Sequence, residues 1–176
     1  EIYTRPYSFP TRRSSDLLEA ELSYFSSLTV VNEDFQLPRK YSFAGYEVDL
    51  SNDRVYEKLQ KIFKNEIKAA YKYIPRSGEY FPYFDEVFRE YGIPGDVKYL
   101  SIAESALNPN ATSHAGAAGI WQFMPRTARA YGLEITDYID ERRDIIKSTE
   151  AAARYLKANY SQLQSSGIDD WLLAMC

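Results

Sequence analysis

The sequence has little from which to build a metal centre or a disulfide. It contains a single cysteine, Cys176, and a single histidine, His114. One cysteine excludes a disulfide within the chain and a zinc site made of cysteines. One histidine leaves little basis for a histidine zinc cluster or a Ser-His-Asp triad. We therefore expect no bound metal and no organic cofactor.

The chain also lacks basic charge, long apolar runs and strand-like alternation. Its 21 Lys and Arg residues against 25 Asp and Glu residues give a net charge of -4, so no basic face predicts a nucleic-acid partner. No apolar run reaches the ~18 residues that a membrane span needs. Without long period-two segments, 176 residues predict one almost wholly helical domain with a real core.

The first residues do not resemble the rest of the chain. Residues 8–17, SFPTRRSSDL, and residues 1–4 resemble the two ends of a translated sequencing adaptor. We interpret residues 1–17 as foreign to the gene, the alternative being a native basic arm, and we leave them out of the fold. Residues 18–53 have weak periodicity and are interpreted as a loose N-terminal segment. No signal peptide is visible in this sequence.

Apolar stripes and capping signals define the helices of the remaining chain. Pro75 to Gly78 is predicted to be a turn, and the small run Ala151 to Ala153 allows another helix to pack closely. The predicted helices lie at about 54–73, 80–91 and 145–163, and a last one begins at Trp171 after a cap at Asp169 or Asp170.

One carboxylate occupies an unusual position for a charged residue. Glu104 follows Val97 and Leu100 and precedes Leu107 at steps that place all of them on one helix face. We therefore expect Glu104 on the stripe that meets the core, where loss of solvation raises its pKa and suits it to act as a general acid. The alternative is a core glutamate paired with an arginine.

A loop of small residues follows this glutamate. Asn108-Pro109-Asn110 is expected to stop the helix, because proline cannot continue it. From Ala111 to Gly119 no side chain is larger than His114, which lets a bulky ligand approach the backbone. The alternative is a flexible connector. A short helix carrying Gln122 and Met124 is expected next, with Pro125 in its first turn.

Together these residues resemble the signature of the soluble lytic transglycosylase (SLT) domain. The matching residues are Glu104-Ser105, then Ser113, then GAAGIWQFMP at 116–125, then Thr127-Ala128. The flanking VKYLSIAES and KSTEAAARYL resemble the membrane-bound D type of this family. The resemblance covers about residues 48–176 and implies an all-α, lysozyme-like (goose-type) catalytic domain at 54–176.

The resemblance also implies the reaction. Family members cleave the bond between N-acetylmuramic acid and N-acetylglucosamine in the glycan strands of peptidoglycan. These glycan strands would be the binding partner of this chain. Glu104 would protonate the glycosidic oxygen and then act as base while the muramoyl 6-hydroxyl attacks. The expected product is a 1,6-anhydro end formed without water, so the resemblance implies a lyase, and we expect it to need no cofactor or metal.

Other matched positions acquire expected roles from the same resemblance. Ser113, Gln122 and Met124 correspond to residues that contact the sugar or line the cleft. Ser105, grouped with them, is expected to support the turn after Glu104. The residues expected to shape the loop are Gly116, Ala117 and Gly119; His114 is expected to be exposed and Trp121 to lie in the core.

Two other functions remain open. A lysozyme-type hydrolase would need a second carboxylate, and the candidates lie in a polar stretch that looks solvated. These are Glu134, Asp137, Asp140, Glu141 and Asp144. The other alternative is a non-catalytic module that binds the cell wall.

The resemblance finally implies where the protein works and how much of it is present. Members of the family act in the bacterial periplasm or cell envelope, and a full-length protein can carry an outer-membrane anchor and C-terminal glycan-binding repeats. The family continues beyond Cys176 with an Ala-Tyr-Asn motif, so we expect a catalytic domain truncated at its C-terminus.

Overall fold

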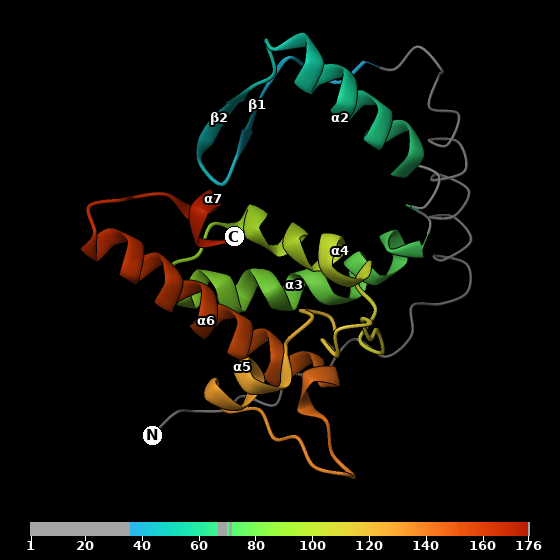
Figure 1. Cartoon of the computed structure of the whole chain (residues 1–176), viewed down its shortest axis with the longest axis vertical. Coiled ribbons are helices and arrows are strands. Elements are labelled where there is room, and N and C mark those ends of the chain that lie inside the picture. The colour runs from blue at the N-terminus through green and yellow to red at the C-terminus, as the bar shows by residue number, and fades with distance from the viewer. Residues whose placement is uncertain (1–35, 67–69, 71, 176) are drawn as a thin grey trace. The chain divides into compact units, whose positions relative to one another are not determined.

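A computed structural model describes residues 36–66, 70 and 72–175 (Figure 1). They fall into two compact units, one made of the described residues within 1–40 and 49–80, the other of those within 41–48 and 81–176. The interpretation of residues 1–17 as foreign lies outside the described residues. The predicted domain start at residue 54 stays a prediction.

In the first unit, helix α2 (Asp53–Glu66) begins where the capping signals place it. The sequence predicts an apolar stripe of Val55, Leu59, Ile62, Phe63, Ile67 and Ala70 on the buried face of this helix. Ile67 lies outside the described residues, and the prediction is wrong at Val55 and Ile62, which are each 46% exposed. The buried face instead carries Tyr56 and Gln60. The Tyr56 hydroxyl donates to the Leu37 carbonyl at 2.9 Å and the Gln60 amide oxygen accepts from the Leu37 N–H at 2.9 Å. These polar contacts with the preceding segment select the buried face.

A short β-hairpin adds two strands to the helical fold that the sequence predicts. Strands β1 (Lys40–Phe43) and β2 (Tyr46–Asp49) pair in a two-stranded sheet. Ala44 and Gly45 join them with φ angles of 52° and 85°. Positive φ at both central positions is the geometry of a tight hairpin turn, usually made by Asn-Gly or Gly-Gly.

Helix α3 (Ile74–Tyr91) begins earlier than the sequence predicts. Pro75 and Gly78, expected to form a turn, lie inside its first turns. Proline is tolerated there because its missing N–H has no partner in the first turn of a helix. The Ser77 hydroxyl donates to the Ile74 carbonyl at 2.7 Å and helps to hold this start.

The core of the second unit forms around α3 and the long helix α6 (Ile145–Ser165), which matches its predicted span closely. Phe84 and Phe88 of α3 are fully buried, and their rings lie 5.0 and 5.7 Å from the Trp121 ring. Ala151, Ala152 and Ala153 of α6 are all buried, which fits the close packing expected at this run of small residues. The prediction that Trp121 belongs to the core is confirmed.

The remaining elements of this unit are short. They are the 3-10 helices η2 (Gly95–Tyr99) and η3 (Glu141–Arg143) and the helices α4 (Leu100–Ser105), α5 (Pro125–Ala130) and α7 (Trp171–Ala174). α6 contacts α7 and η3. Asp170 accepts N–H bonds from Leu172 and Leu173, which confirms the cap predicted for the last helix. The described part of the chain is mostly helical, as expected.

Candidate active site

Glu104 lies near the C-terminal end of α4, where the backbone turns sharply. α4 ends at Ser105, three positions before the proline signal at Asn108-Pro109-Asn110. Ala106 and Leu107 have φ angles of 52° and 58°. Left-handed backbone at a non-glycine residue is costly and often lies at functional sites. The fully buried Leu107 side chain anchors this turn.

The Glu104 side chain is exposed, which corrects the expectation that it lies in the core. The prediction assumed one α-helix from Val97 to Leu107. The structure instead has a 3-10 helix up to Tyr99 and left-handed residues after Ser105, so the face that buries Val97 and Leu107 does not include Glu104. The change of helix type therefore turns the carboxylate outward.

Glu104 nevertheless borders a cavity and is partly shielded from water. Burial by neighbouring atoms raises the pKa of its carboxyl group above the ordinary value. The residue is exposed at the same time, so its carboxyl group lies at the mouth of the cavity. Among the described residues, none forms a salt bridge with it. Within the described residues, Glu104 is therefore not a core glutamate paired with an arginine.

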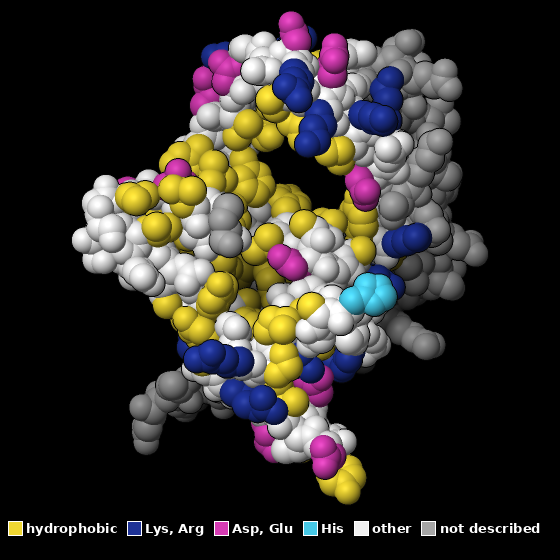
Figure 2. Space-filling view, viewed as in Figure 1, with side chains coloured by type: hydrophobic (Ala, Val, Ile, Leu, Met, Phe, Trp, Pro, Cys, Tyr) yellow, Lys and Arg dark blue, Asp and Glu magenta, His cyan; other side chains and the backbone are white. Residues whose placement is uncertain are grey.

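The cavity has a volume of about 230 Å³. This is below the ~300–1,000 Å³ of sites that enclose a whole small ligand, so it would hold part of a larger one. On this face, hydrophobic side chains gather between α4 and α6 (Figure 2). The lining comprises Leu100, Glu104, Trp121, Gln122, Phe123, Met124, Thr127, Ala152, Tyr155, Leu156 and Met175. Glu104 is the only carboxylate among these described lining residues.

Gln122 and Met124 share this cavity with Glu104, but they do not lie on a helix. α5 begins only at Pro125, with Met124 as its N-cap and proline in the first turn as predicted. Gln122 has a φ of 49°, and its amide nitrogen donates to the Gly119 carbonyl at 2.8 Å. The Met124 side chain is 43% exposed. The loop therefore presents an amide and a thioether to the cavity.

Ser105 connects the glutamate helix to this loop. Its hydroxyl donates to the Ile120 carbonyl at 2.9 Å and accepts from the Asn108 N–H at 3.2 Å. It is absent from the cavity lining. This arrangement fits the expected supporting role, because the residue next to Glu104 holds the loop that carries Gln122.

Ser113 does not line the cavity either, although a sugar contact was expected for it. Its hydroxyl accepts from the Ala117 N–H at 3.0 Å, which closes a turn. Gly116 and Gly119 have φ angles of 87° and 84°, and Ala117 is buried. His114 is exposed, as expected. A substrate role for Ser113 stays a prediction.

Gly119 has a second, steric reason to be glycine. A Cβ atom at this position would lie 1.7 Å from the carbonyl oxygen of Arg142. Backbone therefore packs directly on backbone here, and only glycine fits. A Cβ atom at Gly116, by contrast, would have no heavy atom within 4 Å apart from those of Gly116 and its two chain neighbours.

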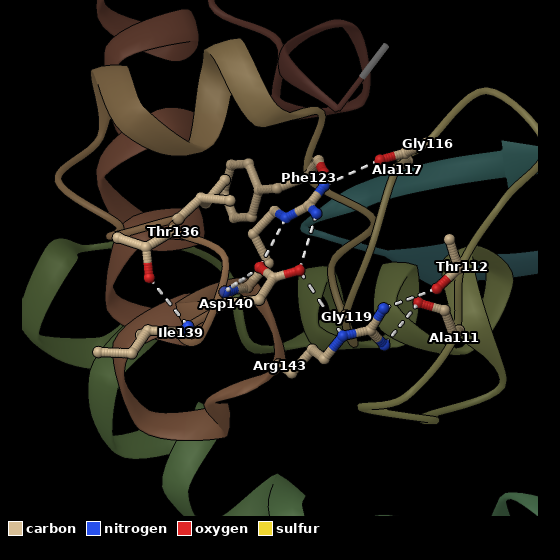
Figure 3. Close-up of polar contacts among 12 residues, drawn as sticks. Ala111, Thr112, Gly116, Ala117, Gly119, Phe123, Thr136, Ile139, Asp140 and Arg143 are labelled. Carbon is tan, nitrogen blue, oxygen red and sulfur yellow. Dashed lines mark hydrogen bonds and ion pairs between the residues drawn. The ribbon is translucent and has the colours of Figure 1, made fainter.

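The sequence analysis missed a group of arginines that holds the loop. Arg142 is buried, 8% exposed, and its guanidinium donates to both carboxylate oxygens of Asp140 at 2.8 Å. The same guanidinium donates to the carbonyls of Gly116 at 2.8 Å and Phe123 at 3.0 Å. Arg143 donates to the Thr112 hydroxyl at 2.7 Å (Figure 3).

Asp140 and Glu141 are therefore not the solvated acids that the sequence suggested. Hydrogen bonds from Arg142 lower the pKa of Asp140. The N–H of Glu134 and the ammonium of Lys147 lower the pKa of Glu141. An aspartate two residues before an arginine was the available signal, and alone it is weak.

The described residues contain neither a cluster of metal ligands nor a membrane-spanning helix. Within 36–66, 70 and 72–175, no three His, Cys, Asp or Glu side chains gather as a metal site would require. No helix in the described part of the chain is long and apolar enough to cross a membrane.

Comparison with known proteins gives a family match over the second half of the chain. The model described as "Transglycosylase SLT domain" matches residues 84–176. The membrane-bound lytic murein transglycosylase D of Escherichia coli, in strains K12 and O6:H1, is 36% identical over 138 residues, which is 77% of this chain and 29% of each relative. The membrane-bound lytic murein transglycosylase F of Ectopseudomonas mendocina (strain ymp) is 28% identical over 103 residues, 56% of this chain and 20% of that protein. The chain thus spans less than a third of the length of these relatives.

Proposed function

Because the chain belongs to the transglycosylase SLT domain family, we propose that it is a lytic transglycosylase that cleaves the glycan strands of peptidoglycan. The observation that carries this proposal is Glu104, an acid without a salt bridge among the described residues, with a raised pKa, at a cavity that it shares with Gln122 and Met124. The E. coli relatives are named as lytic murein transglycosylases. The lysozyme-like helical fold of the family agrees with the mostly helical structure.

In this proposal Glu104 acts twice. Its protonated carboxyl group donates to the glycosidic oxygen between N-acetylmuramic acid and N-acetylglucosamine, and the bond from C1 to that oxygen breaks. The N-acetyl group of the substrate helps to stabilise the positive charge at C1. The Glu104 carboxylate then accepts the proton of the muramoyl 6-hydroxyl while this oxygen bonds to C1. The acid is regenerated, and a 1,6-anhydro end forms without water.

The cavity lining supports a reaction that needs one carboxylate. A glycosidase that hydrolyses its substrate usually places two carboxylates around the scissile bond. Glu104 is the only carboxylate among the described lining residues. The other acids considered from the sequence, such as Asp140 and Glu141, are held by Arg142 and Lys147. A sugar-supplied nucleophile removes the need for a second acid.

We extend the proposal to substrate contacts and location. Gln122 and Met124 would contact the sugar beside Glu104, and Ser113 would do so at the outer part of the loop. Peptidoglycan would be the macromolecular partner. The cell envelope, or the periplasm, would be the place of action, because the E. coli and Ectopseudomonas relatives are named membrane-bound.

The test is to digest purified sacculi with the protein and to identify the released muropeptides by mass spectrometry. We expect 1,6-anhydro ends, each lighter by one water than the corresponding hydrolysis product. Glu104→Gln should release them at least about 100-fold more slowly. Glu134→Gln, a change at an exposed acid outside the cavity, should release the wild-type amount. Reducing ends in place of anhydro ends would assign a hydrolase. Binding to sacculi without any release would assign the non-catalytic module.

A further inference from the structure

The loop beside Glu104 is closed by a single guanidinium group. Nη1 of Arg142 donates to the Gly116 carbonyl and to the Phe123 carbonyl, which lie at the two ends of the segment 116–123. Within this segment Ala118 and Phe123 form two mutual backbone hydrogen bonds, each of 3.1 Å. Arg142 therefore reinforces the closure of a loop whose end contributes Gln122 to the cavity.

The guanidinium is itself held in one orientation. Its Nε and Nη2 atoms donate to the two carboxylate oxygens of Asp140, a bidentate pair that fixes a planar group in direction as well as in position. The Asp140 side chain is 24% exposed and the Arg142 side chain 9%. Arg142 thus meets the acceptors that a buried charge requires. The arginine can direct Nη1 at the loop without an unpaired charge.

Two further contacts fix the loop relative to the glutamate helix. The Arg142 backbone packs against Gly119, where no Cβ atom fits. Ser105, next to Glu104, donates to the Ile120 carbonyl between the two closed ends. The loop is therefore attached to the arginine turn on one side and to the end of α4 on the other. Displacement at either attachment would change the distance between Gln122 and Glu104.

We propose that Arg142 is a positioning residue, whose guanidinium sets the loop 116–123 so that Gln122 in the loop, and Met124 directly after it, face the cavity in register with Glu104. It has no place in the cavity lining and acts through the loop. The inference rests on the proposed transglycosylase activity and adds a residue outside the cavity to it. Lysine cannot replace this group, because one ammonium cannot reproduce a planar fork with donors on two sides.

The experiment compares Arg142→Lys and Arg142→Met with wild type on soluble, uncrosslinked glycan strands, at a temperature where circular dichroism shows each variant to be folded. We expect kcat to fall about 10-fold in the lysine variant and about 100-fold in the methionine variant, as for a misplacement of about 1 Å. KM should change less than kcat. Arg129→Met is the matched control, since Arg129 is exposed on α5, and should stay within about 2-fold of wild type.

A second readout separates positioning from general stability. Amide hydrogen exchange should become faster in 116–123 in the Arg142→Lys variant and stay unchanged in α6. If Arg142→Met does not fold, the lysine variant alone decides the question. Wild-type kcat in the folded lysine variant, or a KM effect larger than the kcat effect, would overturn the inference while the transglycosylase activity stands. If the wild-type protein released no anhydro products, both the proposed transglycosylase activity and the role of Arg142 would be overturned.

Discussion

Glu104 and Asp140 belong to the same unit, and their carboxylates have opposite surroundings. Asp140 is paired with Arg142 at 2.8 Å, and hydrogen bonds from that arginine lower its pKa. Glu104 has no salt bridge among the described residues, and burial raises its pKa. A carboxylate that must hold and release a proton needs surroundings like those of Glu104, which raise its pKa. A carboxylate that must stay charged and fixed needs a paired environment like that of Asp140. The contrast separates a candidate catalytic acid from a structural one.

The largest effect expected is on activity, from Glu104→Gln. The change keeps the shape and removes the transferable proton, so turnover of peptidoglycan should fall by about 10²–10⁴-fold. Because Glu104 is exposed and lacks a salt bridge among the described residues, the free energy of unfolding should stay unchanged within about 0.5 kcal/mol. Anhydro-muropeptide release and urea unfolding measure the two quantities. Substantial remaining turnover would remove Glu104 from its assigned role.

The second prediction tests the attachment of the loop to the arginine turn. Gly119→Ala places a Cβ atom against the Arg142 carbonyl oxygen in a left-handed conformation, and it should lower the free energy of unfolding by about 3 kcal/mol or more. Gly116→Ala is the matched control, with the same sign of φ and open space around the new atom. It should cost only about 1 kcal/mol. Equal losses in urea unfolding would show that the close contact is absent in solution.

The sequence predicted some elements of the fold and missed others. The long helix α6 was placed closely, because its apolar stripe is long and regular. The short helix α5 was predicted with Pro125 in its first turn, but it does not include Gln122 and Met124, which were expected on it. The hairpin was missed because its strands are short and its turn is Ala44-Gly45, a weak turn signal. The start of α3 was missed because proline also suits a first helical turn.

The candidate site divides in the same way. Glu104, Gln122 and Met124 lie close in sequence, and the structure places them around one cavity. The exposure of Glu104 depended on a 3-10 turn that residue spacing does not reveal. The role of Arg142 depended on contacts with carbonyl groups 19 and 26 residues away. Backbone acceptors have no sequence signature, so no pattern could have paired them with this arginine.

The third prediction concerns the paired acid. Asp140→Asn keeps the size of the side chain and removes the charge that compensates Arg142, which is only 9% exposed. Breaking a fully buried pair costs ~3–5 kcal/mol, and because Asp140 is 24% exposed we expect about 2 kcal/mol. Urea unfolding at neutral pH measures this difference. A loss as small as that of an exposed ion pair would mean that the guanidinium keeps its position without the carboxylate.

The two acids should also give opposite pH dependences. The pKa of Asp140 is lowered in the folded protein, so its contribution to stability is present above the unfolded pKa, about 3.9, and is lost as the pH falls through the folded value. The stability gap between wild type and Asp140→Asn should therefore narrow on acidification. The pKa of Glu104 is raised, so proton donation, and with it activity, should decline as the pH rises through that value. Unfolding and initial rates across the pH range measure both trends.

The smallest effect expected comes from Glu141→Gln, which completes a series of three acid-to-amide changes. The Glu141 carboxylate accepts the Glu134 N–H at 2.7 Å and pairs with Lys147, and both contacts lower its pKa. Glutamine keeps an acceptor for the N–H and loses only the ion pair. Since the Lys147 side chain is 55% exposed, water screens that pair, and the loss in the free energy of unfolding should be about 0.5 kcal/mol.

Urea unfolding should thus rank Asp140→Asn as the most destabilising change, Glu141→Gln next and Glu104→Gln last. Activity should rank Glu104→Gln first by a wide margin. If Glu141→Gln reduced activity as strongly as Glu104→Gln, the distinction between a fixed acid and a free one would not hold, and a second carboxylate would enter the reaction.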